Sequence, residues 1–343
     1  MERRRKITEL RPLVLLIAAC FALQIHASSE NDVDAIFYEP FDESFEGRWI
    51  VSAKDEYKGV WKLSKSEGHD DYGLVLSEKE ARKYAVVKEL DEAVSLKDRT
   101  TIVLQFEVRL QNGLECGGAY LKYLRPQEAP EGYFDNDPPY SIMFGPEKCE
   151  CVSTNKVHFI FKHKNPKSGE YVEHHLKNPP SVPADKLSHV YTAILKPDSE
   201  VTILVDGEEK NKASFLSTQD FEPALIPAKT IPDPNAVKPD NWDENPSYKG
   251  IWKSQQIPNP DYFETEKPDF EAIAAIGIEI WTMQDGILFD NILIADDEKV
   301  AESYRITTWK PKFDVEKEKQ KAEDAAGGLF SSFQIVGVPF LDA

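Results

Sequence analysis

Hydrophobic and polar residues alternate along much of the chain with a period of two, which is the spacing of β-strands. The clearest run, 101–111, places on one face Ile102, Leu104, Phe106, Val108 and Leu110, and on the other Gln105, Glu107 and Arg109. We therefore expect a half-buried strand here. The run 156–164 repeats the alternation, while 191–196 and 201–205 flank a turn as a hairpin. Many such strands in one chain predict an all-β sandwich or jelly roll.

Two later runs continue the strand pattern. Residues 273–283 alternate isoleucine with glycine, glutamate and tryptophan, and 286–295 is expected to be their hairpin partner. Before them, 222–269 is rich in proline, acidic residues and tryptophan and interrupts the sandwich. Residues 314–325 predict a charged, exposed helix with little apolar face.

The N-terminal end of the chain predicts entry into the secretory pathway, and the C-terminal end bears on anchoring and retention. Residues 1–27 combine a basic start, an apolar run at 13–23 and the small residue Ala27, which is typical of a secretory signal peptide. The final stretch, 329–343, is apolar but too short and too interrupted to cross a bilayer, so we expect no transmembrane anchor. No KDEL-like retention signal ends the chain.

The composition bounds the class of protein. A chain of 343 residues with 41% hydrophobic residues can form one large domain with an appendage. Removing the leader leaves 36 basic and 58 acidic residues, a formal charge of −22. This excess of negative charge argues against a nucleic-acid partner. It is typical of a solvated surface, and weak calcium buffering is the functional alternative.

The cysteines allow more than one pairing. Cys20 leaves with the leader, so Cys116, Cys149 and Cys151 remain. A bond between Cys149 and Cys151 would close a very small, strained ring. We favour a disulfide between Cys116 and Cys149, while one between Cys116 and Cys151 remains geometrically possible.

Two segments around these cysteines resemble the signature segments of the calnexin and calreticulin family, which are lectin chaperones of the endoplasmic reticulum. The first is RLQNGLECGGAYLKYL at 109–124, and the second is SIMFGP-x-x-C at 141–149. The second departs from the family at Glu147 and Glu150, where aspartate and glycine are usual. The resemblance is closest to the plant calnexins. It implies a concanavalin-like or legume-lectin-like β-sandwich.

The proline-rich interruption resembles a shortened form of the family's proline-rich arm. Residues 231–244 resemble one copy of the arm's first repeat type, and 245–264 resemble the last copy of its second type. In the family the tip of the arm binds a thiol-disulfide isomerase, so this binding is doubtful here. We expect Trp242 and Trp252 to pack across the stem. An extended proline-rich linker is the alternative.

These features divide the chain into five predicted segments. They are a signal peptide, the first part of the lectin sandwich, the shortened arm, the last sandwich strands, and a charged helix with a truncated tail. Their limits are, in order, 1–27, 32–221, 222–269, 270–310 and 311–343.

A sugar site needs flat aromatic faces for the C–H side of the ring and charged or amide groups for the hydroxyls. By resemblance, the carbohydrate-binding residues are Tyr120, Lys122, Tyr140, Met143, Glu147, Glu173, Glu279 and Trp281. On strands, Tyr120 would share a face with Lys122, and Glu279 with Trp281.

The sequence pattern suggests a different interpretation for two of these sugar-site residues. Alternation groups Tyr140 with Ile142 and Phe144, on the face opposite Met143. Glu173 also has a simpler interpretation, as a solvated loop carboxylate.

A metal site is suggested by resemblance more than by spacing. Calcium takes oxygens from separated segments, and the chain has no EF-hand loop. By resemblance, the calcium ligands include Ser44, Asp71 and Asp290. A histidine metal site is a weaker hypothesis, because without cysteine partners at zinc spacing surface histidines are the better interpretation of His158, His163, His174 and His175.

The resemblance implies a function without catalysis. It implies a calcium-binding lectin chaperone in the lumen of the endoplasmic reticulum, which binds monoglucosylated high-mannose N-glycans on unfolded glycoproteins and assists their folding. One alternative is a sandwich-fold glycoside hydrolase, with Glu279 and Asp290 as the only tempting carboxylate pair. The Glu-x-Asp-x-x-Glu strand of such hydrolases is missing. The other alternative is a truncated splice product without chaperone function.

Overall fold

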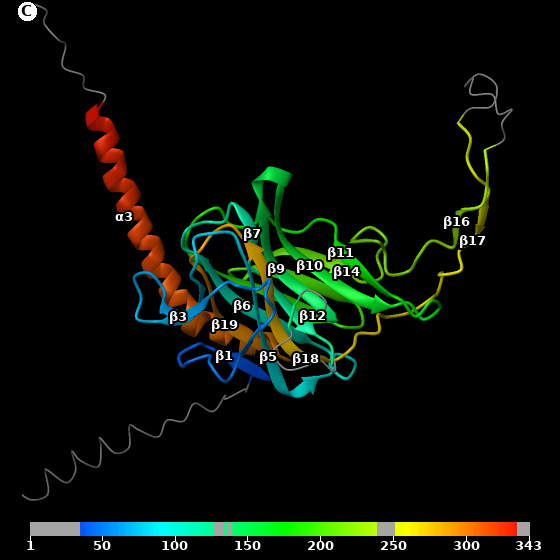
Figure 1. Ribbon diagram of the computed structural model, residues 1–343, viewed down its shortest axis with the longest axis horizontal. Coiled ribbons are helices and arrows are strands. Elements are labelled where there is room, and N and C mark those ends of the chain that lie inside the picture. Colours follow the sequence, from blue (N-terminus) through cyan, green and yellow to red (C-terminus); the bar gives the residue numbers. More distant parts are fainter. Residues whose placement is uncertain (1–34, 127–133, 136–138, 239–250, 335–343) are drawn as a thin grey trace, which may run out of the picture. The chain divides into compact units, whose positions relative to one another are not determined.

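The computed structural model of the protein describes residues 35–126, 134–135, 139–238 and 251–334. The predicted leader, Trp242 and residues 335–343 lie outside the described residues. The secondary structure is mostly antiparallel strands followed by C-terminal helices (Figure 1). In the described ranges, every helix is too short or too polar to cross a membrane.

Two large antiparallel sheets form the sandwich. The first, of eight strands, has the order β14-β13-β12-β6-β19-β4-β3, with β1 paired to β19. Its strands are β1 (Phe37–Glu39), β3 (Trp61–Lys65), β4 (Tyr72–Leu76), β6 (Ile102–Leu110), β12 (Ser188–Lys196), β13 (Glu200–Val205), β14 (Glu208–Ser214) and β19 (Ile287–Ala295). The hairpin predicted at 191–205 is the β12–β13 pair.

The second sheet, of nine strands, has the order β15-β11-β10-β9-β7-β18-β5-β2, with β8 paired to β18 and β9. Its strands are β2 (Ile50–Val51), β5 (Arg82–Val94), β7 (Cys116–Gly118), β8 (Leu121–Leu124), β9 (Tyr140–Cys149), β10 (Thr154–Lys164), β11 (Tyr171–Leu176), β15 (Phe221–Glu222) and β18 (Ile273–Thr282). A short turn of 3-10 helix, η1 (Glu150–Val152), joins β9 to β10. The all-β sandwich predicted from alternation is confirmed.

Aromatic side chains fill the space between the sheets, because each strand turns alternate side chains inward. Phe106 of β6 meets Phe144 of β9 edge to face, with ring centroids 5.7 Å apart. Phe159 and Tyr191 pack beside them and are buried. Burying a side chain of this size contributes roughly 1.5–3 kcal/mol. The core therefore holds the two sheets together and leaves their outer faces for other contacts.

Both faces of β6 are buried, which corrects the half-buried strand expected from its sequence. Its outward residues lie under the helices α2 (Glu298–Tyr304) and α3 (Lys310–Gln334), which are joined by a π-helical turn, η2 (Arg305–Trp309). Gln105 donates a hydrogen bond to the Ala301 carbonyl at 3.0 Å, and Arg109 lies 3.1 Å from Glu316. Polar strand residues are thus satisfied by the helices, which alternation within one strand does not reveal.

The strands β18 and β19 are consecutive but belong to different sheets, which corrects the hairpin expected at 273–295. β18 pairs with β5, while β19 pairs with β6. The turn between them contains Gly286 at φ 72°, a conformation that favours glycine. Alternation indicates that both are strands, but not which sheet each one joins.

The proline-rich segment leaves and re-enters the sandwich through a two-stranded ladder, β16 (Thr230–Pro232) with β17 (Gln256–Pro258). Thr230 pairs with Pro258, and Pro232 pairs with Gln256. The two ends of this arm therefore lie side by side at its stem (Figure 1).

Candidate functional site

A row of polar and aromatic side chains lies on the outer face of the nine-stranded sheet. Leu121 and Phe144 point into the core, so Lys122 and Met143 point away from it. The register sets Lys122 opposite Met143 on one side and Gly277 on the other. We call this surface the polar face, and its members are Tyr120, Lys122, Tyr140, Met143, Lys162, Glu173, Glu279 and Trp281.

A buried ion pair occupies the centre of the polar face. Lys122 Nζ of β8 lies 2.7 Å from Glu279 Oε2 of β18, and the side chains are 1% and 9% exposed. The Tyr57 hydroxyl donates to the other carboxylate oxygen, Oε1, at 2.9 Å. Two donors from distant parts of the sequence therefore fix the orientation of the Glu279 carboxylate, as a ligand-binding acceptor requires.

A second polar group lies on the adjacent strands β9, β10 and β11. Tyr140 donates its hydroxyl to Glu173 Oε1 at 2.6 Å, and Lys162 Nζ lies 3.1 Å from the same oxygen. Burial opposes ionisation of Glu173, but hydrogen bonds from Tyr140 and Lys162 lower the pKa of this carboxyl. Burial, together with the bond to Glu173, raises the pKa of Tyr140. Glu173 is thus a strand residue in a hydrogen-bond network, which corrects the loop interpretation.

Two ammonium groups connect the ion pair to this network. Lys162 Nζ lies 4.2 Å from the centroid of the Tyr140 ring, and Lys122 Nζ lies 6.0 Å from the same centroid. Both distances fall within the range of cation–π attraction. Tyr140 therefore lies between the two groups, and the polar face is continuous.

The position of Tyr140 corrects the face expected from alternation. Tyr140 packs with Met143 in a cluster on the polar face, whereas Ile142 lies in the core. A register shift between β8 and β9 sets Leu124 opposite Tyr140, so Ser141 has no counterpart on β8. This extra residue forms a β-bulge, which turns Tyr140 to the opposite face.

Tyr120 occupies the end of the polar face next to β7. It precedes β8, and its ring centroid lies 4.8 Å from that of His158. Burial, with the nearby charges of Glu279 and Glu147, raises the pKa of Tyr120. Glu147 itself lies 3.3 Å from Lys156 Nζ. The structure thus places Tyr120 within the electrostatic reach of two other predicted site residues.

His158 is buried beside Tyr120, which corrects the expectation of a surface histidine. Burial, helped by the charge of Lys156, lowers the pKa of His158 to about 3. Its Nε2 atom is buried and has no hydrogen-bond partner within the part of the chain that the structure describes. A buried polar atom of this kind can be completed by a water molecule or a ligand.

Trp281 provides an exposed aromatic surface on the same strand as Glu279. Its side chain is 43% exposed. It borders a shallow hollow of about 460 Å³, whose other lining residues include Lys58, Glu78, Arg82 and Lys83. An exposed indole beside charged side chains suits stacking on a sugar ring with hydrogen bonds at the rim.

Three residues at the polar face were missed by sequence reasoning: Tyr57, His158 and Lys162. The alternation of 156–164 does place His158 and Lys162 on the face opposite Phe159, so it contained a signal for both. Tyr57 lies outside any strand and reaches Glu279 from 222 residues away, so it had no sequence signal.

The predicted calcium ligands fall into two separate groups. Asp71 Oδ2 and Asp290 Oδ2 meet at the ammonium of Lys312, at 2.5 and 2.7 Å. Glu107 adds a third carboxylate at 2.9 Å. Ser44 belongs to a different hydrogen-bond group, in which its hydroxyl accepts from a backbone N–H two residues further on at 3.3 Å.

Lys312 neutralises this acidic cluster inside the protein. Burial raises the pKa of Asp290, and the neighbouring Glu107 raises it further. Burial opposes the charge of Lys312, but Glu107 and Asp290 raise its pKa. Asn291 Nδ2 donates to Glu107 at 2.8 Å and to Asp290 at 3.0 Å. The three carboxylates are thus compensated by side chains.

This arrangement does not fit the predicted calcium set as it lies. Calcium takes about six to eight oxygens, and Lys312 already contacts one oxygen of each carboxylate. Ser44 contributes no oxygen to the cluster. Over the described ranges, side chains that converge as metal ligands do are found only at Cys116, Cys149 and Cys151.

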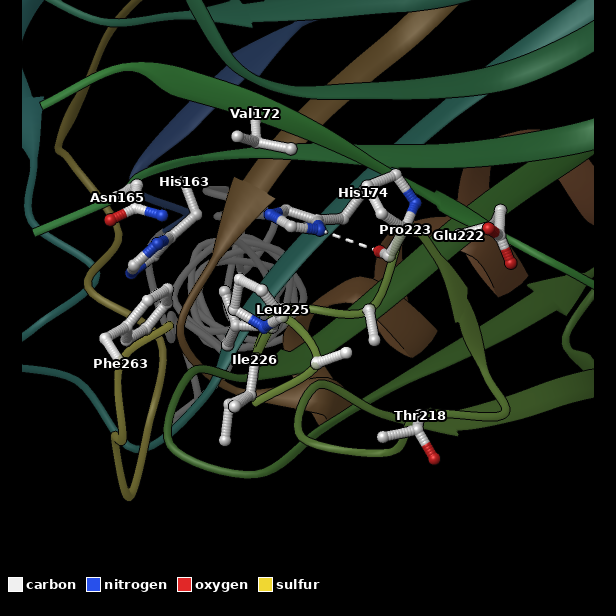
Figure 2. Close-up of a pocket in the computed structure, with 13 residues that line it drawn as sticks. His163, Asn165, Val172, His174, Thr218, Glu222, Pro223, Leu225, Ile226 and Phe263 are labelled. Carbon is white, nitrogen blue, oxygen red and sulfur yellow. Dashed lines mark hydrogen bonds between the residues drawn. The ribbon is translucent and has the colours of Figure 1, made fainter. Parts of the chain in front are cut away.

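A separate pocket of about 350 Å³ lies where the arm joins the sandwich (Figure 2). The ring of His163 stacks on Phe263, with centroids 5.7 Å apart, and His174 Nδ1 donates to the Pro223 carbonyl at 2.8 Å. Burial lowers the pKa of both histidines. These histidines therefore hold the base of the arm. His175 lies 3.3 Å from Glu173, and His158 lies beside Tyr120, so the four histidines considered for a metal do not converge on one point.

Of the two disulfides left open by the sequence, the structure contains the one between Cys116 and Cys149. These cysteines are direct partners in the ladder of β7 and β9. Cys151 is free and exposed.

The carboxylate pair considered for a hydrolase is not assembled. Glu279 lies on the outer face of the nine-stranded sheet, bonded to Lys122. Asp290 belongs to the other sheet and is bonded to Lys312 of α3. A glycosidase needs its two carboxyl groups on either side of one bond, at about 5–9 Å. The core between the sheets separates these two.

A two-sheet sandwich with polar and aromatic side chains on one outer face defines a lectin-like protein. Residues 37–245 and 244–294 match the family model described as the calreticulin family. A calnexin homolog of Glycine max is 56% identical over 96% of this chain and 80% of its own length. Calnexin homolog 1 of Arabidopsis thaliana is 57% identical, over 87% of this chain and 74% of its own length.

A solved structure agrees with these relatives. The globular domain of T. cruzi calreticulin superposes with a TM-score of 0.66 at 28% identity, covering 85% of this chain and all of that domain. The chain belongs to the calreticulin family. Its members are lectin chaperones, so the resemblance found in the cysteine segments is confirmed.

Proposed function

We propose that this protein is a calcium-binding lectin chaperone of the endoplasmic reticulum, which binds monoglucosylated high-mannose N-glycans on unfolded glycoproteins. The observation that supports this most is the continuity of the polar face, from the Lys122–Glu279 pair through Tyr140 to Glu173. Family membership supports the same class of function.

The proposed glycan contacts follow from the chemistry of the polar face. Glu279 offers acceptor oxygens and Lys122 a donor to sugar hydroxyls, while Trp281 and Tyr120 offer ring surfaces to the C–H side of the sugar. Because the Lys122–Glu279 pair and Tyr140 are already buried, a bound sugar would cover little further surface beyond the exposed ring of Trp281. We therefore expect modest affinity.

Retention on an immobilised monoglucosylated high-mannose glycan tests this proposal. Trp281→Ala removes an exposed stacking surface, so we expect about tenfold weaker binding, which corresponds to about 1.4 kcal/mol. Tyr72→Ala is the matched control, because Tyr72 is 37% exposed on the other sheet. Equal retention of the wild type and Trp281→Ala would place the glycan site elsewhere.

The same column separates the alternatives. A lectin releases the glycan with its mass unchanged, whereas a hydrolase releases a trimmed product. A protein without function does not retain the glycan at all.

Calcium binding is proposed on the basis of family membership, with the acidic cluster around Lys312 as its candidate location. Asp71, Glu107 and Asp290 supply carboxylate oxygens of the kind that calcium prefers. For calcium to take them, Lys312 has to leave. Calorimetric titration with calcium checks this, and the absence of binding heat would remove calcium from the proposal.

Partner binding by the arm is proposed to be weak. The family-type arm corresponds here to residues 231–264, of which the stem ladder is described. An extended chain covers about 3.3 Å per residue, so a hairpin of this length reaches at most about 55 Å. Titrating a thiol-disulfide isomerase against the protein tests this. Tight binding that survives deletion of residues 231–264, or that matches a relative with a full arm, would contradict weak recruitment of the isomerase.

A further inference from the structure

Three sulfur atoms meet at the end of β9. The disulfide joins Cys116 of β7 to Cys149 of β9. Cys151 lies two residues further on, in η1, and is exposed. Its sulfur lies 3.1 Å from Cys149 Sγ, and all three sulfurs lie within 4.8 Å of one another. A free thiol therefore contacts a disulfide of the same chain.

We propose that Cys116, Cys149 and Cys151 form a thiol–disulfide exchange site, through which the protein alternates between two disulfide isomers. The Cys151 thiol gives its proton to water, and the thiolate attacks Cys149 Sγ. A bond forms between Cys149 and Cys151 while the bond from Cys149 to Cys116 breaks. Cys116 leaves with the electron pair as a thiolate and takes a proton from water. The exchange causes no net oxidation or reduction of the protein, so it needs no external oxidant.

Backbone hydrogen bonds keep the strands around the site in place when the disulfide changes from Cys116–Cys149 to Cys149–Cys151. The backbone carbonyl of Cys116 accepts from Met283 N at 2.9 Å, and its N–H donates to Gln284 Oε1 at 3.2 Å. On the other side, Glu150 N donates to the Glu115 carbonyl at 3.0 Å. These hydrogen bonds hold β7 and the η1 turn without the disulfide. Exchange is therefore compatible with the folded sheet.

The second isomer has a different reactivity. A disulfide between Cys149 and Cys151 closes a small ring in an exposed turn, and strained or exposed disulfides are the labile ones. A thiol from solution reaches this turn more easily than the half-buried Cys116–Cys149 bond. The exchange thus allows the protein to react with thiols from solution. This inference is independent of glycan binding.

Disulfide mapping on the full chain tests the proposal. The folded protein is held at about pH 8 without added thiol, because the thiolate is the attacking species. It is then quenched with acid, denatured, labelled with a maleimide, digested without reduction and analysed by mass spectrometry. Cys20 falls on its own peptide and does not enter the comparison. We expect label on both Cys151 and Cys116 in the wild type, and label on neither Cys116 nor Cys149 in Cys151→Ser.

A second measurement covers the case in which the new isomer is scarce. We expect dithiothreitol to reduce the disulfide about tenfold faster in the wild type than in Cys151→Ser, because the exposed isomer offers a faster route. Val152→Ser, an exposed neighbour in the same turn, is the control and should react like the wild type. Either result supports exchange. Label on Cys151 alone together with equal reduction rates in the wild type and Cys151→Ser would overturn it.

Discussion

Single charged residues of the polar face are held by partners on other strands. Lys122 and Glu279 are 157 residues apart in sequence, their charged atoms are 2.7 Å apart in space, and both side chains are buried. Removing one member of such a pair leaves an uncompensated buried charge. A loss of glycan binding after such a change could come from a lost sugar contact or from the destabilised fold. Trp281, whose side chain is exposed, is therefore the better first test.

A double-mutant cycle measures the coupling energy between Lys122 and Glu279. Glu279→Gln removes the charge that balances Lys122, so we expect the free energy of unfolding to fall by about 3 kcal/mol. Lys122→Met/Glu279→Gln removes both charges and should lose less than the sum of its two single variants. Urea unfolding of the four proteins gives the coupling energy. Strict additivity would mean that the pair does not interact.

Strands and faces were largely predictable, while contacts between elements were not. Alternation gave the strands of the sandwich, including β6 and the β12–β13 hairpin, because a period of two is a local property. Alternation assigned Tyr140 to the wrong face of the sheet. One extra residue in a β-bulge reverses the face to which the side chains beyond the bulge point. Alternation could not show that α2 and α3 bury the polar side of β6, because that contact joins distant segments.

The candidate site had a similar limit. By resemblance, the cysteine segments predicted Tyr120 and Lys122 as site residues, and the favoured disulfide between Cys116 and Cys149 is the one in the structure. The sequence could not show that Lys312, and not Ser44, contacts Asp71 and Asp290. Nothing in a charged helix marks which of its lysines points toward the sheet.

At the level of elements, Lys312 connects helix α3 to the turn between β3 and β4 and to the strands β6 and β19. Its ammonium contacts Asp71, Glu107 and Asp290 from three parts of the sequence. Trp309 adds an anchor, because its Nε1 donates to the Ser188 carbonyl at 3.0 Å and its ring is buried. The helix is therefore held at its start, next to the sheet.

The second prediction concerns this anchor. Lys312→Met leaves buried carboxylates without their cation, so we expect the free energy of unfolding in EDTA to fall by about 3–5 kcal/mol. Calcium should restore more stability to this variant than it adds to the wild type, because it can then replace the ammonium. Thermal unfolding with and without calcium checks this. Lys310→Met is the control, because Lys310 pairs with the exposed Asp314.

At the level of the whole molecule, two buried histidines have pKa values that are shifted in opposite directions, and both shifts affect the dependence of stability on pH. His189 donates between Asp185 and Asp206, at 2.7 and 2.8 Å. Burial opposes its charge, but the bonds to these carboxylates raise the pKa of His189 to about 9. The pKa of His158 is lowered instead, as described for the polar face.

The third prediction follows from the sign of the His189 shift. Between about pH 6.5 and pH 9 the folded protein keeps a proton on His189 that the unfolded chain releases. The stabilisation is therefore complete below about pH 6.5 and is lost as the pH rises through 9, by up to about 1.4 kcal/mol per pH unit. Urea unfolding across this range checks it. His189→Gln should show a flatter profile, and an unchanged slope would contradict the assignment.

The stem of the arm has a consequence for how proteins of this family diversify. Because β16 and β17 are paired, the chain leaves and returns at one point, and Thr230 and Pro258 stay side by side whatever lies beyond them. Residues inserted or deleted past Pro232 and Gln256 change the length of the arm without straining the sandwich. The length of the arm can thus evolve without a change in the two sheets.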